Sequence, residues 1–224
     1  MGMESIHDVE KEPIDSSQYV AVVLGVPPSG GRHIGIWYRA DDDGNPNTLH
    51  LAWHCMLENV ASPPAYFTLW VKSSYPAPRL RQAAAYIRRV WTANGRSAIP
   101  YSFSSPNDSL DPETGAFLLG PTRLGLTCAS FVLAVFHGAR LPLINYATWV
   151  ADRPGDREWQ EWIIEQLESR GADRQHIEHL RSEIGAVRFR PEEVAAGAAL
   201  APPPADFGTA SVLGEQIVTR LSGT

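Results

Sequence analysis

The chain has 224 residues, of which 44% are hydrophobic, enough for one domain with a core and some additional helices. Its net charge of −6 opposes phosphate binding, so we expect no nucleic-acid partner. Two cysteines are too few for a disulfide framework and fit a reducing compartment, and the polar N-terminus lacks the apolar segment of a secretory signal. With no apolar run long enough for a membrane span, the sequence predicts a cytoplasmic protein.

The first third of the chain carries strand patterns, after residues 1–17, which we expect to form a flexible arm. β-branched and apolar residues predict strands over 19–26, 32–39, 48–56 and 66–72. Turns rich in proline, glycine, asparagine and aspartate separate them, including a polar turn at 41–47. Together the four strands predict an antiparallel meander.

The pattern then changes to that of helices. Apolar residues recur at helical spacing over 79–93. A loop over 95–125 follows, and a loop of this length inside a domain is usually functional or disordered. Residues 127–137 predict a short apolar helix that ends at Gly138.

Charged amphipathic helices are predicted in the C-terminal third, over 157–170, 173–184 and 209–221, with a further helix that starts at Pro191. We expect residues 151–224 to form a helical extension that packs on the domain or on a partner, where it adds specificity or assembly rather than chemistry. His176 and His179 lie among charged residues, so we expect them on a solvated face. The extension also offers a surface for a protein partner or a second copy of the chain.

Cys128 follows Thr127 at the predicted start of the apolar helix. Unpaired N–H groups and the helix dipole stabilise a thiolate at such a position, which predicts a cysteine nucleophile. A histidine on a neighbouring strand, such as His33, could supply the proton transfer. The alternative is that Cys128 only fills the core, as most lone cysteines on apolar helix faces do.

Strand alternation places His33, Gly35 and Trp37 on one face, and His50 and His54 on one face of the next strand. If the two strands pair, His50 can lie beside His33 and fix its tautomer, the role of the third member of a triad. His54 is the alternative third member. Gly35 leaves room beside His33, and Trp37 can line a substrate groove on the same face.

Three segments in the order His, His, Cys carry a resemblance to a known family. These are residues 33–37 (HIGIW), 50–52 (HLA) and 127–132 (TCASFV). They are similar to the motifs of the circularly permuted NlpC-type papain-like superfamily, especially its lecithin:retinol acyltransferase-like branch. The resemblance implies a papain-like α+β domain over 18–150, with an antiparallel sheet packed on a helix that bears the cysteine.

The resemblance also implies roles for individual residues. Cys128 would be the nucleophile, His33 the general base and acid, and His50 the orienting residue. Tyr101 lies in a segment, 99–103 (IPYSF), that resembles one found near the oxyanion site of relatives. Together with Tyr101, we expect Thr127 and Trp37 to form the oxyanion and substrate contacts.

The sequence therefore predicts a cysteine-dependent hydrolase, a peptidase, amidase, isopeptidase or thioesterase that uses a Cys-His-His triad and an acyl-enzyme. Its substrate would be a peptide, a protein or an acylated molecule, and no cofactor is implied. A metal site at His50, His54 and Cys55 is disfavoured because the spacing of the two histidines converges on a helix, not on a strand.

Two alternatives remain open. One is an acyltransferase or phospholipase of the lecithin:retinol acyltransferase-like type, although Ala129 and Ser130 stand where that branch carries a Glu-His pair. The other is a non-catalytic protein-binding module on the same fold.

Overall fold

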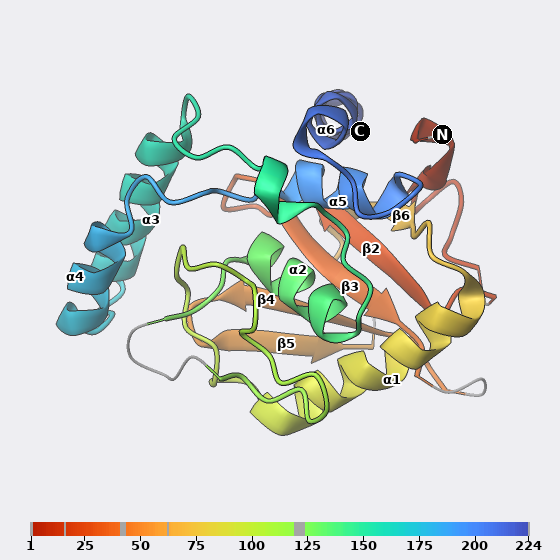
Figure 1. Cartoon of the computed structure of the whole chain (residues 1–224), viewed down its shortest axis with the longest axis horizontal. Helices are drawn as coiled ribbons and strands as arrows, with labels where there is room; N and C mark the ends of the chain where they lie inside the picture. Colours follow the sequence, from red (N-terminus) through yellow and green to blue (C-terminus); the bar gives the residue numbers. More distant parts are fainter. Residues whose placement is uncertain (1, 16, 41–43, 62, 119–123, 224) are drawn as a thin grey trace.

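The computed structural model describes residues 2–15, 17–40, 44–61, 63–118 and 124–223. They form an α+β fold with one antiparallel sheet and six α-helices, as the sequence predicts at the level of fold class (Figure 1). The strands are β1 (Ile6–Asp8), β2 (Val20–Gly25), β3 (His33–Tyr38), β4 (Asn47–Trp53), β5 (Met56–Val60) and β6 (Phe67–Lys72). The helices are α1 (Ala77–Asn94), α2 (Cys128–Gly138), α3 (Asp156–Ser169), α4 (Arg174–Ser182), α5 (Pro191–Ala199) and α6 (Phe207–Ser222), with short 3-10 helices η1 (Met3–Ser5) and η2 (Tyr146–Thr148).

The strand order is β1-β6-β2-β3-β4-β5, which differs from the predicted meander in the place of its last strand. β2 to β5 follow one another as neighbours, but β6 returns to pair with β2 on the side away from β3. The predicted strand over 48–56 is in fact two. β4 ends at Trp53, a tight turn follows with Cys55 at a φ of 51°, and β5 begins at Met56. Residues 41–43 of the predicted polar turn and 119–123 of the predicted loop lie outside the described residues.

The N-terminal segment belongs to the sheet, so the expected flexible arm over 1–17 is wrong for its central residues. Ile6–Asp8 pairs with β6 at the edge of the sheet. The His7 ring stacks on Trp70 with centroids 4.2 Å apart, and the Trp70 indole N–H donates to the carbonyl of Glu12 at 2.6 Å. A strand of three residues is too short to produce an alternating sequence pattern.

The two faces of the sheet are covered differently. Alternate side chains such as Ile34 and Ile36 face the main core, which contains α1, α2 and α5. The other face carries a small cluster built on Trp37, Phe67 and Trp70, against which the N-terminal segment packs. His33 and His50 have ring contacts with Phe67, so both histidines lie toward this second face.

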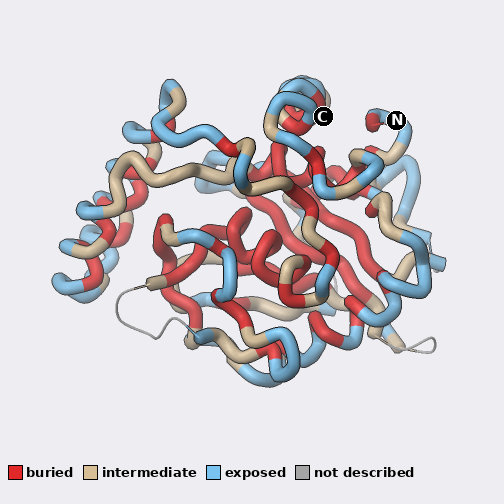
Figure 2. The backbone as a smooth tube through the Cα atoms, viewed as in Figure 1, coloured by how far each residue is buried: buried red, intermediate tan, exposed pale blue. Residues whose placement is uncertain are grey.

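Helix α2 is buried along nearly its whole length, and only His137 among its eleven residues is not buried (Figure 2). A capping box fixes where it starts. The Thr127 hydroxyl accepts from the Ser130 N–H at 3.1 Å, and the Ser130 hydroxyl accepts from the Thr127 N–H at 2.8 Å. Cys128 is therefore held as the first residue of the helix.

The C-terminal third supplies helices on two sides of α2. α5 is buried against the sheet and α2, and α6 packs on α5 and buries Leu213, Ile217 and Leu221. α3 and α4 pack on each other at the left of the molecule in Figure 1, apart from α5 and α6. In the part of the chain that the structure describes, no helix combines the length and apolar character that crossing a bilayer requires.

The irregularity in the pairing of β2 with β6 generates a prediction about two glycines. At Gly25 a Cβ would lie 1.7 Å from the backbone oxygen of Tyr66, so Gly25→Ala must push the strands apart. We expect it to lower the free energy of unfolding by about 1–3 kcal/mol in urea titrations. Gly208→Ala is the control, because a Cβ there meets nothing within 4 Å and alanine favours the helix. Equal stability of the two variants would contradict this packing.

Candidate active site

Cys128 at the start of α2 and His33 at the start of β3 both line a cavity of about 160 Å³. The cavity lies at the end of the β3–β4 pair, where Ala52 and Trp53 of β4 line it. Tyr101 lines it from the long loop between α1 and α2. The chain thus brings residues from three distant segments to one small space.

The two histidines of the predicted triad are in direct contact. His33 Nε2 and His50 Nδ1 are 3.0 Å apart, and both side chains are buried. At Gly35 a Cβ would lie 3.0 Å from the Cβ of His50. The glycine therefore makes room for His50, rather than for His33 as the sequence suggested. His54 lies in the turn before β5, where its Nδ1 accepts from the Tyr101 N–H at 3.2 Å.

A carboxylate on β5 lies close to the histidine pair. His50 faces Glu58 in the β4–β5 register, and its buried Nε2, which has no hydrogen-bond partner among the described residues, lies 3.7 Å from a Glu58 oxygen, close enough for the negative charge to favour a proton on that nitrogen. A proton on that nitrogen leaves His50 Nδ1 as acceptor for the His33 Nε2–H. His33 Nδ1 is then unprotonated, which is the form a general base needs.

Burial, not the helix dipole, dominates the acidity of Cys128. The pKa of the thiol is raised to about 11 by burial, although the N–H groups of Ile34 and Ala129 and the charge of Arg188 lower it. The effect of burial on the Cys128 pKa therefore outweighs the stabilisation of a thiolate that the sequence predicts at the helix N-terminus. Burial also lowers the pKa of His33 to about 3, with a smaller contribution from His50. At neutral pH the site holds a neutral thiol and a neutral imidazole.

Tyr101 is fixed beside the first residue of α2. Its hydroxyl interacts with both the backbone N–H and the sulfur of Cys128. Its backbone is held on one side by His54 and on the other by His176, whose Nε2 lies 2.8 Å from the Tyr101 carbonyl oxygen. His176 is 2% exposed, so the solvated face expected for it is wrong. The N–H of Cys128 and the Tyr101 hydroxyl can together stabilise an oxyanion.

Glu183, just after α4, holds the segment that follows Tyr101. Its carboxylate accepts from the Ser102 hydroxyl at 2.7 Å, the Phe103 N–H at 3.1 Å and the Ser104 hydroxyl at 2.6 Å. His179 Nε2 lies 3.5 Å from the same carboxylate. The α4 region of the predicted extension thus positions a loop of the cavity.

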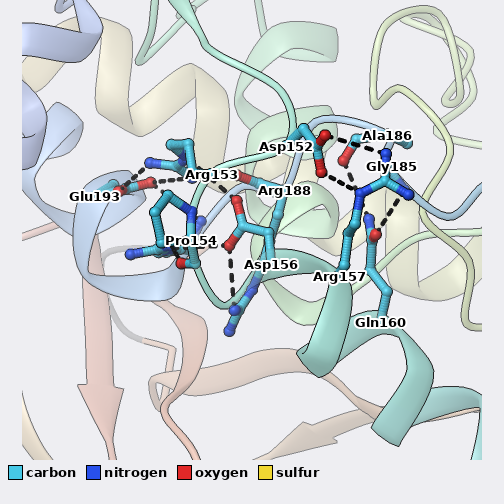
Figure 3. A network of polar contacts seen from close by, with 11 residues as sticks. Asp152, Arg153, Pro154, Asp156, Arg157, Gln160, Gly185, Ala186, Arg188 and Glu193 are labelled. Atoms are coloured by element: carbon cyan, nitrogen blue, oxygen red, sulfur yellow. Dashed lines mark hydrogen bonds and ion pairs between the residues drawn. The ribbon is translucent and has the colours of Figure 1, made fainter.

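A wall of the cavity comes from residues that the sequence did not single out. Trp159, Trp162 and Ile163 of α3 line it, together with Arg188. The Arg188 guanidinium lies over the Trp159 ring at 4.0 Å from its centroid and contacts Asp156 at 3.3 Å (Figure 3). The spacing of the three α3 residues marks an apolar helix face, but not the surface that it meets.

The other two residues predicted to contact the substrate or the oxyanion are Trp37 and Thr127, and only one of them lines the cavity. Trp37 lies in the cluster on the second face of the sheet and is not among the residues that line the cavity. Thr127 lines the cavity and also caps α2. Within the described residues, no group of three or more His, Cys, Asp or Glu side chains is arranged to hold a metal ion.

Comparisons of this chain with protein-family models, with curated proteins and with solved structures give no match. The geometry of the site is therefore the basis for a functional proposal, and the family stays a resemblance carried by three short motifs.

The neutral thiol and imidazole lead to a spectroscopic prediction. Because burial raises the pKa of Cys128 to about 11, its thiolate absorbance should be absent at pH 7 and develop only in alkaline solution. The measurement is the ultraviolet difference between the wild type and Cys128→Ser, both carrying Cys55→Ser so that the second thiol does not contribute. A thiolate signal at pH 7 would contradict the neutral pair.

The three contacts of Glu183 predict that the loop depends on it. Glu183→Ala should lower the free energy of unfolding by about 1–3 kcal/mol, since it removes the partner of buried donors, and should speed hydrogen exchange at the Phe103 amide. Glu178→Ala, in the adjoining helix α4, is the control, because within the described part of the chain Glu178 forms just one exposed pair, with Arg174. Equal exchange at Phe103 in both variants would refute the clamp.

Proposed function

We propose that this chain is a cysteine-dependent hydrolase that cleaves an amide, isopeptide or thioester bond through an acyl-enzyme. The observation that carries the proposal is that Cys128 and His33 line one cavity while His33 is hydrogen-bonded to His50. The resemblance of the three motifs to the permuted NlpC-type papain-like superfamily points to the same chemistry.

In the proposed reaction, the Cys128 sulfur attacks the substrate carbonyl carbon as His33 Nδ1 takes the thiol proton. The N–H of Cys128 and the Tyr101 hydroxyl stabilise the oxyanion that forms. The bond to the leaving group then breaks, and His33 returns the proton to the leaving amine or thiol. Water attacks the thioester with help from His33, which releases the acid and restores the thiol.

The neutral resting state is compatible with this order of events. A thiol with a raised pKa is a weak nucleophile until a base removes its proton. His33 is unprotonated at neutral pH, but its lowered pKa makes it too weak a base to form an ion pair with Cys128 beforehand, so the proton has to move as the sulfur attacks. His50 holds the ring and the tautomer without contacting the substrate.

Amide or thioester cleavage is favoured over reaction with a lipid. The cavity of about 160 Å³ is smaller than the roughly 300–1,000 Å³ typical of pockets that enclose a drug-sized ligand. Such a space suits a substituent of the size of one side chain better than an acyl chain. The replacement of the Glu-His pair by Ala129 and Ser130 agrees with this preference.

The test is labelling with acyl-electrophile activity probes, combined with turnover of fluorogenic amides and thioesters. Cys128→Ala should abolish both and leave the circular dichroism spectrum unchanged, while Cys55→Ala, the control, should keep both. His33→Ala should lower turnover by about 10²–10⁴-fold, and His50→Gln by less, because a base is needed for the chemistry whereas an orienting residue mainly sets geometry.

Loss of activity in Cys55→Ala rather than Cys128→Ala would refute the nucleophile. Negligible effects of both histidine variants in folded protein would refute the triad. An inert Cys128 would favour the non-catalytic binding module.

A further inference from the structure

The candidate cavity is positively charged in a protein of negative net charge. Its described lining includes two arginines, Arg32 and Arg188, and no aspartate or glutamate, whereas the whole chain carries a net charge of −6. A cavity lined in this way attracts an anionic group.

The two arginines differ in how far their charge is already balanced. Arg32 Nε lies 2.7 Å from an oxygen of Glu192, which serves it as a direct partner. Arg188 contacts Asp156 at 3.3 Å, but that carboxylate also binds Arg153 at 3.2 Å and Arg190 at 2.9 Å. Among the described residues, Arg188 therefore forms its ion pair with a shared carboxylate (Figure 3), and Glu192, the direct partner of Arg32, adds a further attraction without an ion pair to Arg188.

The Arg188 side chain also has an unused hydrogen-bond donor. Within the described part of the chain, its buried Nε has no hydrogen-bond partner. Its guanidinium is held over the ring of Trp159, which lines the same cavity. A buried donor without a partner is costly, and it leaves the charge of Arg188 incompletely satisfied, which favours an anion in the cavity that the side chain lines.

Arg188 lies close enough to the reacting atoms to act on them electrostatically. Its charge lowers the pKa of the Cys128 thiol and of the Tyr101 hydroxyl, against the larger effect of burial on each. Because Arg188 and Cys128 line the same cavity of about 160 Å³, a group bound to Arg188 in that cavity would lie near the carbonyl that Cys128 attacks.

We infer that the substrate carries a carboxylate close to its scissile carbonyl and that Arg188 binds this carboxylate, with Trp159 holding the guanidinium in place. The inference rests on the proposed function and names its substrate class, an acidic or carboxyl-terminal peptide-like acyl compound. A guanidinium offers a planar pair of N–H donors that matches a carboxylate, and one incompletely balanced arginine suits a monoanion.

The test uses two alkylating reagents that react at the same carbon and differ in charge. Iodoacetate carries a carboxylate where iodoacetamide carries a neutral amide. In each, the sulfur bonds to the CH₂ carbon, iodide leaves and the thiol proton is lost to the base. The rate ratio of iodoacetate to iodoacetamide is measured by mass spectrometry at Cys128 and at Cys55 in the same full-length protein. Cys55 serves as the reference because it lies outside the cavity lining.

We expect the ratio at Cys128 to exceed that at Cys55 by tenfold or more. Arg188→Gln should reduce the Cys128 ratio to about that of Cys55, and Arg188→Lys should keep part of the excess. Arg190→Gln is the matched control, since it removes another partner of Asp156 that does not line the cavity, and it should keep the wild-type ratio.

Each other outcome is decisive. Equal ratios at Cys128 and Cys55 in the wild type would overturn the carboxylate site and leave the proposed hydrolase standing, and this comparison holds even if Arg188→Gln does not fold. An excess that persists in Arg188→Gln would overturn the role of Arg188. Failure of both reagents to label Cys128 at pH 7–9, while Cys55 reacts, would overturn the proposed function and the inference with it.

Discussion

Helix α2 is apolar around nearly its whole circumference, and every residue of it except His137 is buried. The sheet covers one side through residues such as Ile34 and Leu49, and α1 and α5 cover others. Burial of an eleven-residue helix in this way removes several large side chains from water, among them Phe131 and Phe136, each worth about 1.5–3 kcal/mol. The return of the C-terminal third to α2 follows from this need, and so does the enclosed position of Cys128.

The same burial decides the chemistry available at the end of the helix. In an exposed site, the helix dipole and nearby N–H groups would favour a thiolate. Here the low polarity around Cys128 and His33 disfavours both charged forms, and the balance falls on the neutral pair. In the proposed reaction, charge would therefore have to develop only as the sulfur attacks, next to the Tyr101 hydroxyl and the Cys128 N–H.

Local sequence patterns predicted most of the secondary structure. Alternation and helical spacing located β2, β3, β6 and the helices to within a few residues, and the N-cap Thr127 fixed the start of α2. The contact of His33 with His50 was also predictable, because it needs only the pairing of two adjacent strands. The tight turn at Cys55 was not predictable, since it lacks glycine and proline, and with it Glu58 was missed.

Contacts between the C-terminal helices and the rest of the chain could not be predicted from the sequence. The charged residues of α3 and α4 suggested solvated faces, and nothing local indicated that His176 and Glu183 would hold the segment around Tyr101. Arg188 lies between helices, where neither periodicity nor a motif marks it. Such contacts depend on where a helix docks, and the docking is set by the shape of the whole core.

The contact of His176 with the Tyr101 carbonyl has a consequence for the order in which the site is assembled during synthesis of the chain. Cys128, His33 and His50 all precede residue 140, whereas the histidine that binds the Tyr101 carbonyl is in α4. A nascent chain released from the ribosome only as far as residue 173 would contain all three of these residues, yet lack His176. Tyr101 would gain its second anchor only after most of the polypeptide had been synthesised, so in the unfinished chain one wall of the cavity would not yet be held in place.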